Sequence, residues 1–215
     1  MKRRSRSGFT LLEVVLTAAL LASVMGAALM VVQRGKSAMA EGHLHARAEA
    51  RAQRALGRVV AELRGAGIDA LTPTLNPNGT TSTQTVTFEP LVGVSGAAPV
   101  WGNPVRIALT PAPEDPADNR DNDSDGLVDE CVLTLTRDVG SVGQSSFLLC
   151  TQVSERAEGE LPNGSDDNGN GLIDEAGFSI QRIGTMLTVR ITVEEPGEGG
   201  SSTLASVVTS LTLRN

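Results

Sequence analysis

Two short acidic segments carry oxygen-bearing side chains at alternate positions, which is the spacing of a calcium-binding loop. Residues 121–130 read DNDSDGLVDE and align without gaps to residues 166–175, which read DDNGNGLIDE. Asp or Asn at positions 1, 3 and 5 lets alternate side chains converge on one hard cation, and glycine at position 6 permits the sharp turn between them. The pattern predicts a structural calcium ion in at least one segment, and favours the first because it offers more carboxylates.

The alignment also defines the candidate ligands. The backbone carbonyl at position 7 is expected to contribute, and position 12, which is Val132 or Gly177, lacks the bidentate glutamate of an EF-hand. An acid at position 9 or 10 must therefore close each shell, and Val128 and Ile173 at position 8 are expected to point into the core. The alternative is a pair of solvated acidic turns, because Asp, Asn and Gly favour turns without any ion. The candidate ligands are Asp121, Asp123, Asp125, Leu127, Asp129 and Glu130 in the first segment, and Asp166, Asn168, Asn170, Leu172, Asp174 and Glu175 in the second.

Few other residues are of a type that does chemistry. Cys131 and Cys150 are the only cysteines, and in an oxidising compartment an even count favours a disulfide between them. His43 and His45 lie together in one helical segment, and no phosphate loop or nucleophile motif accompanies them, so we expect no enzymatic activity. The formal net charge of -7 argues against nucleic acid as a partner of the bulk surface.

The amino-terminal segment is expected to place these residues outside a membrane. Lys2, Arg3, Arg4 and Arg6 precede an apolar run over residues 9–32 whose single charge is Glu13. At about 1.5 Å per helical residue, ~24 residues span the ~30 Å hydrocarbon core, and the basic flank keeps the amino terminus in the cytoplasm. A secretory signal peptide has a shorter apolar region, of about 7 to 15 residues. Neither that reading nor an ordinary anchor explains a carboxylate inside the apolar run, which requires a partner.

The rest of the chain predicts one amphipathic helix followed by strands. Between Ala40 and Leu63 apolar residues recur mostly three or four positions apart, as on one helix face, and Gly65 and Gly67 are expected to cap its end. A long helix followed by antiparallel strands is an α+β fold, and 215 residues with 40% apolar content favour a single globular head. Alternating or β-branched runs predict strands over residues 83–89, 105–110, 131–137, 146–153, 178–182, 186–194 and 204–213.

Residues 8–13, which read GFTLLE after the basic leader, resemble the processing site of type IV prepilins and type II secretion pseudopilins. The resemblance implies that a membrane prepilin peptidase cuts between Gly8 and Phe9 and methylates the new amine of Phe9. It also implies that Glu13 pairs with the Phe9 amine of a neighbouring subunit. A charge that is costly in lipid would then act as an assembly signal.

Two weaker likenesses narrow the family. Residues 63–67 (LRGAG) and the closing residues 211–215 (LTLRN) resemble the matching parts of PilW-type minor pilins and, more loosely, of GspJ-type pseudopilins. The expected organisation is a cleaved leader over residues 1–8, a transmembrane and filament-core helix over 9–32, an amphipathic helix over 33–67, and a β-rich head over 68–215 that carries both acidic segments.

The function that this resemblance implies is that of a minor pilin of a type IV pilus. The precursor would cross the inner membrane once with its head in the periplasm, and the mature subunit would enter an extracellular filament. The implied partners are the prepilin peptidase, the pilus assembly platform and other pilin subunits. Alternatives are a type II secretion pseudopilin and a single-pass calcium-binding adhesin or receptor, although Glu13 and the Gly8–Phe9 junction argue against the last. Filaments of this kind serve motility, adhesion, DNA uptake or secretion, and the resemblance fits all four.

Overall fold

One continuous helix accounts for the amino-terminal part of the chain. The computed structural model describes residues 10–213 and divides the chain between His43 and Leu44 into two units, which we describe separately. Helix α1 (Leu11–Leu63) runs through 53 residues, so the expected long amino-terminal helix is confirmed. The hydroxyl of Thr10 caps its start by accepting a hydrogen bond from the Glu13 N–H at 3.3 Å.

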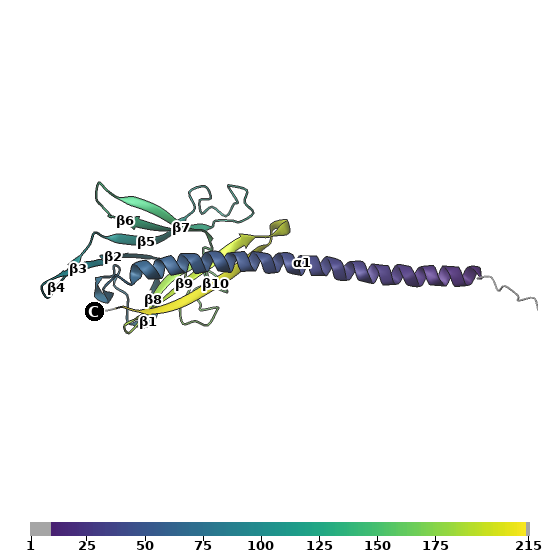
Figure 1. Cartoon of the computed structure of the whole chain (residues 1–215), viewed down its shortest axis with the longest axis horizontal. Coiled ribbons are helices and arrows are strands. Elements are labelled where there is room, and N and C mark those ends of the chain that lie inside the picture. The colour runs from purple at the N-terminus through teal and green to yellow at the C-terminus, as the bar shows by residue number, and fades with distance from the viewer. Residues whose placement is uncertain (1–9, 214–215) are drawn as a thin grey trace, which may run out of the picture. The chain divides into compact units, whose positions relative to one another are not determined.

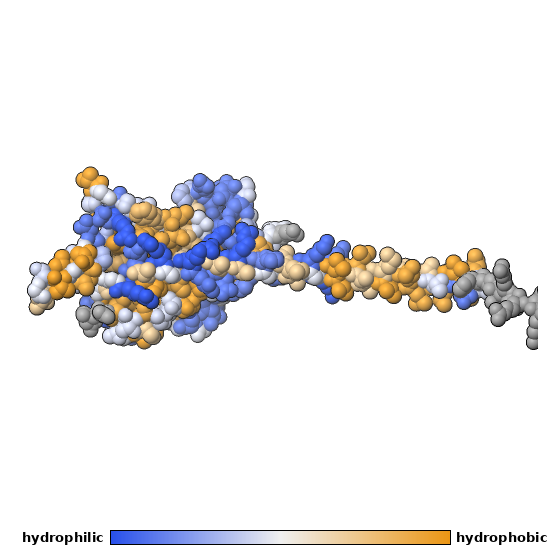
Figure 2. Space-filling model, in the orientation of Figure 1, coloured by the Kyte–Doolittle hydropathy of each residue, from blue (hydrophilic) through white to orange (hydrophobic). Residues whose placement is uncertain are grey.

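In the first unit, α1 has an exposed apolar surface. Its large apolar side chains from Leu11 to Val32 are between 53% and 86% exposed, and the same stretch is largely orange in Figure 2. Among the described residues, α1 is the one helix that is long and apolar enough to cross a membrane. Its sequence is therefore suited to an apolar surrounding that the unit itself does not provide.

The second unit is an antiparallel sheet packed against the last turns of α1 (Figure 1). The order along the sheet is β1-β8-β9-β7-β6-β5-β2, and β10 pairs with the remaining edge of β9 along its whole length. The other edge of β9 pairs with β8 and then, at Val193, with β7. The strands are β1 (Asn78–Thr83), β2 (Thr85–Phe88), β5 (Val105–Pro111), β6 (Cys131–Arg137), β7 (Ser145–Val153), β8 (Phe178–Ile183), β9 (Met186–Pro196) and β10 (Ser202–Thr212).

Four short elements lie outside this sheet. Strands β3 (Leu91–Ser95) and β4 (Ala98–Trp101) form a separate hairpin with exposed side chains. The 3₁₀ helix η1 (Ile68–Ala70) follows α1, and η2 (Glu198–Gly200) connects β9 to β10.

The core forms where the buried face of α1 meets the inner face of the sheet. Ala48, Ala52, Ala55, Leu56, Val59 and Leu63 are the buried residues of the helix. Strand β9 alternates as expected and buries Leu187, Val189, Ile191 and Val193. Each fully buried Leu, Ile, Val or Phe side chain stabilises the fold by roughly 1.5–3 kcal/mol. The expected α+β fold is thus confirmed, with its core on the predicted helix face.

All seven predicted strands are present, and the structure adds three that the sequence analysis did not predict, namely β1, β3 and β4. The expected glycine cap of α1 is wrong, because neither Gly65 nor Gly67 adopts a positive φ. The helix instead tightens at its end, where the Ala66 N–H donates to the Leu63 carbonyl at 2.9 Å. The backbone at Gly67 lies close to the Trp101 ring, since a Cβ there would lie 3.2 Å from that ring.

Candidate cation-binding loops and assembly helix

The two acidic segments belong to a longer structural repeat. We call residues 112–130, which connect β5 to β6, loop 1, and residues 157–175, which connect β7 to β8, loop 2. The Ala112 N–H donates to the Glu130 carbonyl at 3.0 Å, and at the aligned positions the Ala157 N–H donates to the Glu175 carbonyl at 3.0 Å. The same bond therefore closes the base of both loops.

A buried acid that the sequence analysis missed holds each loop together. The Asp115 carboxylate accepts hydrogen bonds from the Asn122 N–H at 2.8 Å and the Asp129 N–H at 2.7 Å. The hydrogen bond from the Asn122 backbone is the largest cause that lowers the pKa of Asp115. In loop 2, Glu160 accepts from the backbone N–H groups of residues 168 and 174, both at 3.1 Å. When the alignment of the two segments is extended toward the amino terminus, Asp115 pairs with Glu160. This pairing is the signal in the sequence that identifies both acids.

The aspartates at position 9 hold the first turn of each loop. Asp129 Oδ1 accepts from the N–H groups of Asp118 at 2.8 Å and Asn119 at 3.0 Å, and its Oδ2 accepts from Asn119 at 2.9 Å. Asp174 makes the same three bonds to the backbone of residues 163–164. The carboxylates of both aspartates are therefore directed to the turn.

Loop 1 contains the acidic segment 121–130, and the three aspartates at positions 1, 3 and 5 of that segment converge. Carboxylate oxygens of Asp121, Asp123 and Asp125 all lie within 4.8 Å of one another. Each of these side chains also accepts a backbone N–H of the loop, at 2.9 to 3.1 Å. The Gln152 amide, from β7, donates to Asp125 Oδ2 at 2.8 Å. Within residues 10–213, no Lys, Arg or His forms an ion pair with any of the three aspartates.

Glu130 adds a fourth acid to this part of loop 1. Its side chain is buried, its Oε2 has no hydrogen-bond partner among the described residues, and it lines the same pocket as Asp123 and Asp125. Burial raises the pKa of Glu130 to about 7, and a side-chain hydrogen bond with Asp115 and the charge of Asp125 act in the same direction. A buried carboxylate of this kind favours a proton or a cation beside it.

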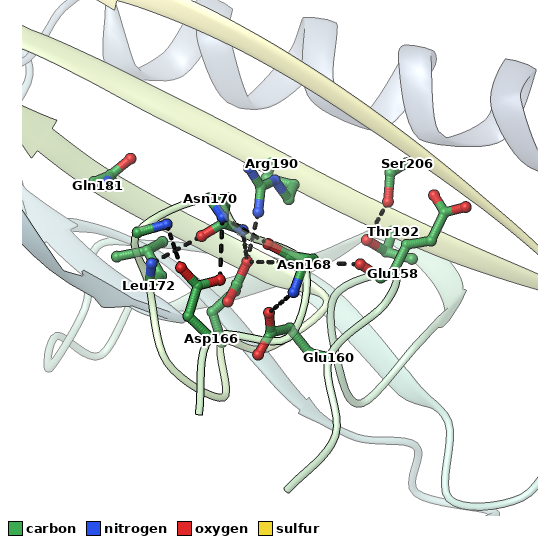
Figure 3. A network of polar contacts seen from close by, with 12 residues as sticks. Glu158, Glu160, Asp166, Asn168, Asn170, Leu172, Gln181, Arg190, Thr192 and Ser206 are labelled. Atoms are coloured by element: carbon green, nitrogen blue, oxygen red, sulfur yellow. Dashed lines mark hydrogen bonds and ion pairs between the residues drawn. The ribbon is translucent and has the colours of Figure 1, made fainter. Parts of the chain in front are cut away.

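Loop 2 receives a positive charge from the sheet. Arg190 of β9 forms an ion pair with Glu175, whose side chain is fully buried (Figure 3 shows the Arg190 guanidinium pointing into the loop). Glu175 Oε1 also accepts from the side-chain amides of Asn168 and Asn170, at positions 3 and 5. At position 1, Asp166 Oδ2 accepts from a backbone N–H of the loop at 2.8 Å. The structure thus brings Asn168, Asn170 and Glu175 together beside the Arg190 guanidinium, while Asp166 and Asp174 bond to the backbone of the loop.

The expected orientation of position 8 is wrong. Val128 and Ile173 are 54% and 63% exposed, whereas Leu127 and Leu172 at position 7 are buried. Residues with positive φ stand at positions 6 and 9 of both loops, and the chain reversal between them turns position 7 inward. The leucine side chains therefore anchor the loops to the head.

The expected disulfide is not formed in the structure. Cys131 and Cys150 are buried free thiols on the adjacent strands β6 and β7. The strand register places Cys150 opposite Leu133 and Cys131 opposite Val153, so the two cysteines are not directly paired. Burial raises the pKa of each thiol to about 11, which keeps both protonated at neutral pH.

The assembly residues are partly described. Gly8 and Phe9, the predicted cleavage site, lie outside the described residues. Glu13 is exposed in the first turn of α1, where its backbone carbonyl accepts the Thr17 hydroxyl at 2.7 Å. Its carboxylate forms no ion pair among residues 10–213.

Comparison with known proteins identifies the class of the amino terminus. Residues 3–29 match the prokaryotic N-terminal methylation motif. No curated protein and no solved structure gave a significant match. The motif indicates a type IV pilin-like or pseudopilin precursor, and together with the apolar helix it fits a membrane-anchored precursor. It implies processing by a prepilin peptidase and assembly with pilin-like subunits, in a family whose role is structural.

Proposed function

We propose that this chain is a minor pilin, a subunit that enters a type IV pilus through α1. The observation that carries the proposal is the exposed apolar surface from Leu11 to Val32, which begins at the methylation motif and contains Glu13 as its only charge. An ordinary membrane anchor accounts for the apolar surface alone. A filament subunit accounts for the carboxylate as well, because an unpaired charge in lipid is costly and a neighbouring subunit supplies its partner.

The proposed assembly step follows from charge pairing and packing. Cleavage after Gly8 frees the amine of Phe9, which carries a positive charge at neutral pH. That amine pairs with Glu13 of a subunit already in the filament, so each entering chain neutralises one buried carboxylate. Small residues such as Ala18, Ala19 and Gly26 allow close helix packing in an apolar surrounding, where van der Waals contact favours association.

The amino-terminal residue of the mature protein tests the processing step. In cells with an active prepilin peptidase, mass spectrometry should find a chain that begins at N-methylated Phe9. A chain that retains Met1, or one cut within the apolar run, would show that the motif is not used.

A matched pair of glutamate substitutions tests the assembly step. Glu13→Ala should leave cleavage intact and lower the amount of the chain in sheared filaments at least tenfold. Glu41→Ala, at an exposed position farther along the same helix, should lower neither. Equal incorporation of both variants would remove the proposed role of Glu13.

A minor pilin and a type II secretion pseudopilin differ in the machine that assembles them, so the two functions are distinguished by the assembly platform that the chain requires. Deleting the assembly platform of the pilus should remove the chain from sheared filaments, and deleting the secretion platform should not. The opposite result would assign the chain to the secretion machine.

A further inference from the structure

We infer that loop 1 binds one calcium ion and that loop 2 binds none, because Arg190 supplies the positive charge that loop 1 lacks. The inference concerns the head alone and is independent of the proposed role in a filament. It rests on the charges that converge in each loop and on what neutralises them.

In loop 1, three carboxylates converge and a fourth, that of Glu130, lines the same pocket as two of them. None of the four has an ion-pair partner among residues 10–213. The oxygens of Asp121, Asp123 and Asp125 lie within 4.8 Å of one another, so the three charges repel one another and a cation between them would relieve that repulsion. Arg120 precedes Asp121 in the chain but forms no ion pair among residues 10–213. Arg51 is linked to the aspartates only through Gln152, to which it donates a hydrogen bond. Its charge is already paired with the buried Glu195 at 2.8 Å, which leaves the aspartates uncompensated.

Glu130 is a separate observation that points to a ligand. It is 5% exposed, and its Oε2 is buried without a hydrogen-bond partner among residues 10–213. Glu175 Oε2 in loop 2 is also buried without such a partner, but Glu175 has the Arg190 guanidinium paired with its Oε1, whereas Glu130 has no ion-pair partner among the described residues. It lines the pocket that Asp123 and Asp125 also line. A carboxylate oxygen in that position is costly unless an ion uses it. Glu130 is therefore the acid that closes the shell.

Asp129, the other candidate for that place, has a different task. Its carboxylate accepts three hydrogen bonds from the backbone of residues 118–119. It is a positioning residue that holds the first turn of the loop, as Asp115 is for the middle of the loop. The ligand set is thus the side chains of Asp121, Asp123, Asp125 and Glu130, with the backbone carbonyl of Leu127 at position 7.

The donor set selects calcium. All the ligands are oxygen atoms and four of them are charged, which suits a hard divalent cation and not zinc, which prefers nitrogen and sulfur. Magnesium keeps several of its waters and prefers one or two carboxylates, whereas calcium accepts six to eight oxygens in a flexible cage. A loop that offers four carboxylates and a carbonyl matches calcium.

Loop 2 has the same backbone with a different charge balance. Asn168 and Asn170 replace the aspartates at positions 3 and 5, and both donate their amides to Glu175 Oε1. In each loop a side chain reaches in from the next strand of the sheet, and it is the neutral Gln152 in loop 1 and the cationic Arg190 in loop 2. In loop 2 the positive charge of the Arg190 guanidinium neutralises Glu175, as we propose a calcium ion does for the acids of loop 1. The same charge would repel a calcium ion.

The experiment measures how many calcium ions each chain holds. The mature full chain in detergent micelles is stripped with chelator and dialysed against radioactive calcium up to 5 mM, with excess magnesium present. The account predicts one ion per chain. No bound calcium over that range, or two ions per chain, would overturn it.

Matched substitutions then place the ion. Asp121→Asn with Asp125→Asn should weaken binding at least tenfold, whereas Asp166→Asn with Asp167→Asn in loop 2 should leave the affinity and stoichiometry unchanged. Circular dichroism and the fluorescence of Trp101, the only tryptophan, check that both variants fold. If the loop 2 pair abolishes binding and the loop 1 pair does not, the assignment is reversed and the proposal fails.

A gain of binding tests the role of Arg190. The triple variant Asn168→Asp, Asn170→Asp and Arg190→Gln should raise the stoichiometry from one ion to two. If this variant folds and still binds one ion, Arg190 and the two amides are not what excludes calcium from loop 2.

Discussion

Loop 1 and loop 2 share one backbone and differ in the source of their positive charge. Both are closed at the base by the same backbone bond, and both use a buried acid and a position 9 aspartate to hold the loop. Loop 1 concentrates carboxylates that have no ion-pair partner within residues 10–213, while loop 2 has amides at positions 3 and 5 and an ion pair with Arg190. The oxygen-and-glycine pattern therefore specifies the shape of such a loop, and the residues around it decide whether an ion is needed.

The largest expected effect lies where the loops join the strands that follow. A Cβ on Gly177, after loop 2, would lie 1.9 Å from the Ser154 carbonyl oxygen, whereas the aligned residue after loop 1 is Val132. Gly177→Ala should therefore lower the free energy of unfolding by about 3 kcal/mol or more, or prevent folding. Val132→Ala should cost about 1 kcal/mol, because it only removes two methyl groups from a half-buried side chain. Urea unfolding followed by Trp101 fluorescence measures both, and equal losses would refute the close approach.

The second effect concerns the internal cation of loop 2. Arg190→Gln leaves the buried Glu175 without its ionic partner, and it should lower the free energy of unfolding by about 2–3 kcal/mol. Adding Glu175→Gln should restore much of the loss. Arg58→Gln is the control, since the Arg58 side chain is more than half exposed and its partner Glu62 keeps a second ion pair with Arg137, and it should change the free energy by less than about 0.5 kcal/mol. Comparable losses in the two single variants would mean that Arg190 is an ordinary surface residue.

The third effect has the opposite sign and belongs to loop 1. Without calcium, Glu130→Gln should stabilise the head at pH 8 by about 1 kcal/mol, because it removes a buried charge and its amide can donate to Asp115. The pKa of Glu130 in the folded chain is raised to about 7. Below the ordinary glutamate pKa, Glu130 is protonated in both the folded and the unfolded chain, and its burial carries no charge penalty. As the pH rises through 7, the folded carboxyl ionises and the stability that its protonated form contributes is lost. The difference between the two chains should accordingly vanish near pH 4. A variant that is less stable than wild type at pH 8 without calcium would contradict this reading.

The smallest effect is expected at position 11, which is Cys131 directly after loop 1 and Ala176 directly after loop 2. With both cysteines free and buried, Cys131→Ala should lower the free energy of unfolding by about 1 kcal/mol, and a reductant should change nothing in wild type. A disulfide between Cys131 and Cys150 would instead add about 3 kcal/mol that a reductant removes. That outcome would restore the pairing expected from the sequence.

The sequence predicted the elements well and the details of the loops less well. The long helix and the seven strands follow from hydrophobic period, because α1 and β9 each bury one regular face. The acidic pattern located both loops. Arg190 was missed because it lies on another strand, and Asp115 because its role depends on backbone N–H groups that converge only after the loop forms.

Two further differences have the same origin in tertiary structure. The burial of Leu127 instead of Val128 depends on left-handed residues that local propensity does not specify. The register of β6 against β7, which offsets Cys131 from Cys150, depends on irregular pairing between those strands. Neither feature has a signal in the spacing of the residues concerned.

The most direct measurement is anomalous diffraction from crystals of the mature chain grown with calcium and then soaked in a lanthanide. The account predicts one strong anomalous peak, in loop 1, with the Asp121, Asp123, Asp125 and Glu130 carboxylates at about 2.3–2.6 Å from the ion. Loop 2 should show no peak and an intact ion pair between Arg190 and Glu175. A peak of equal height in loop 2, or no peak in loop 1, would contradict the account.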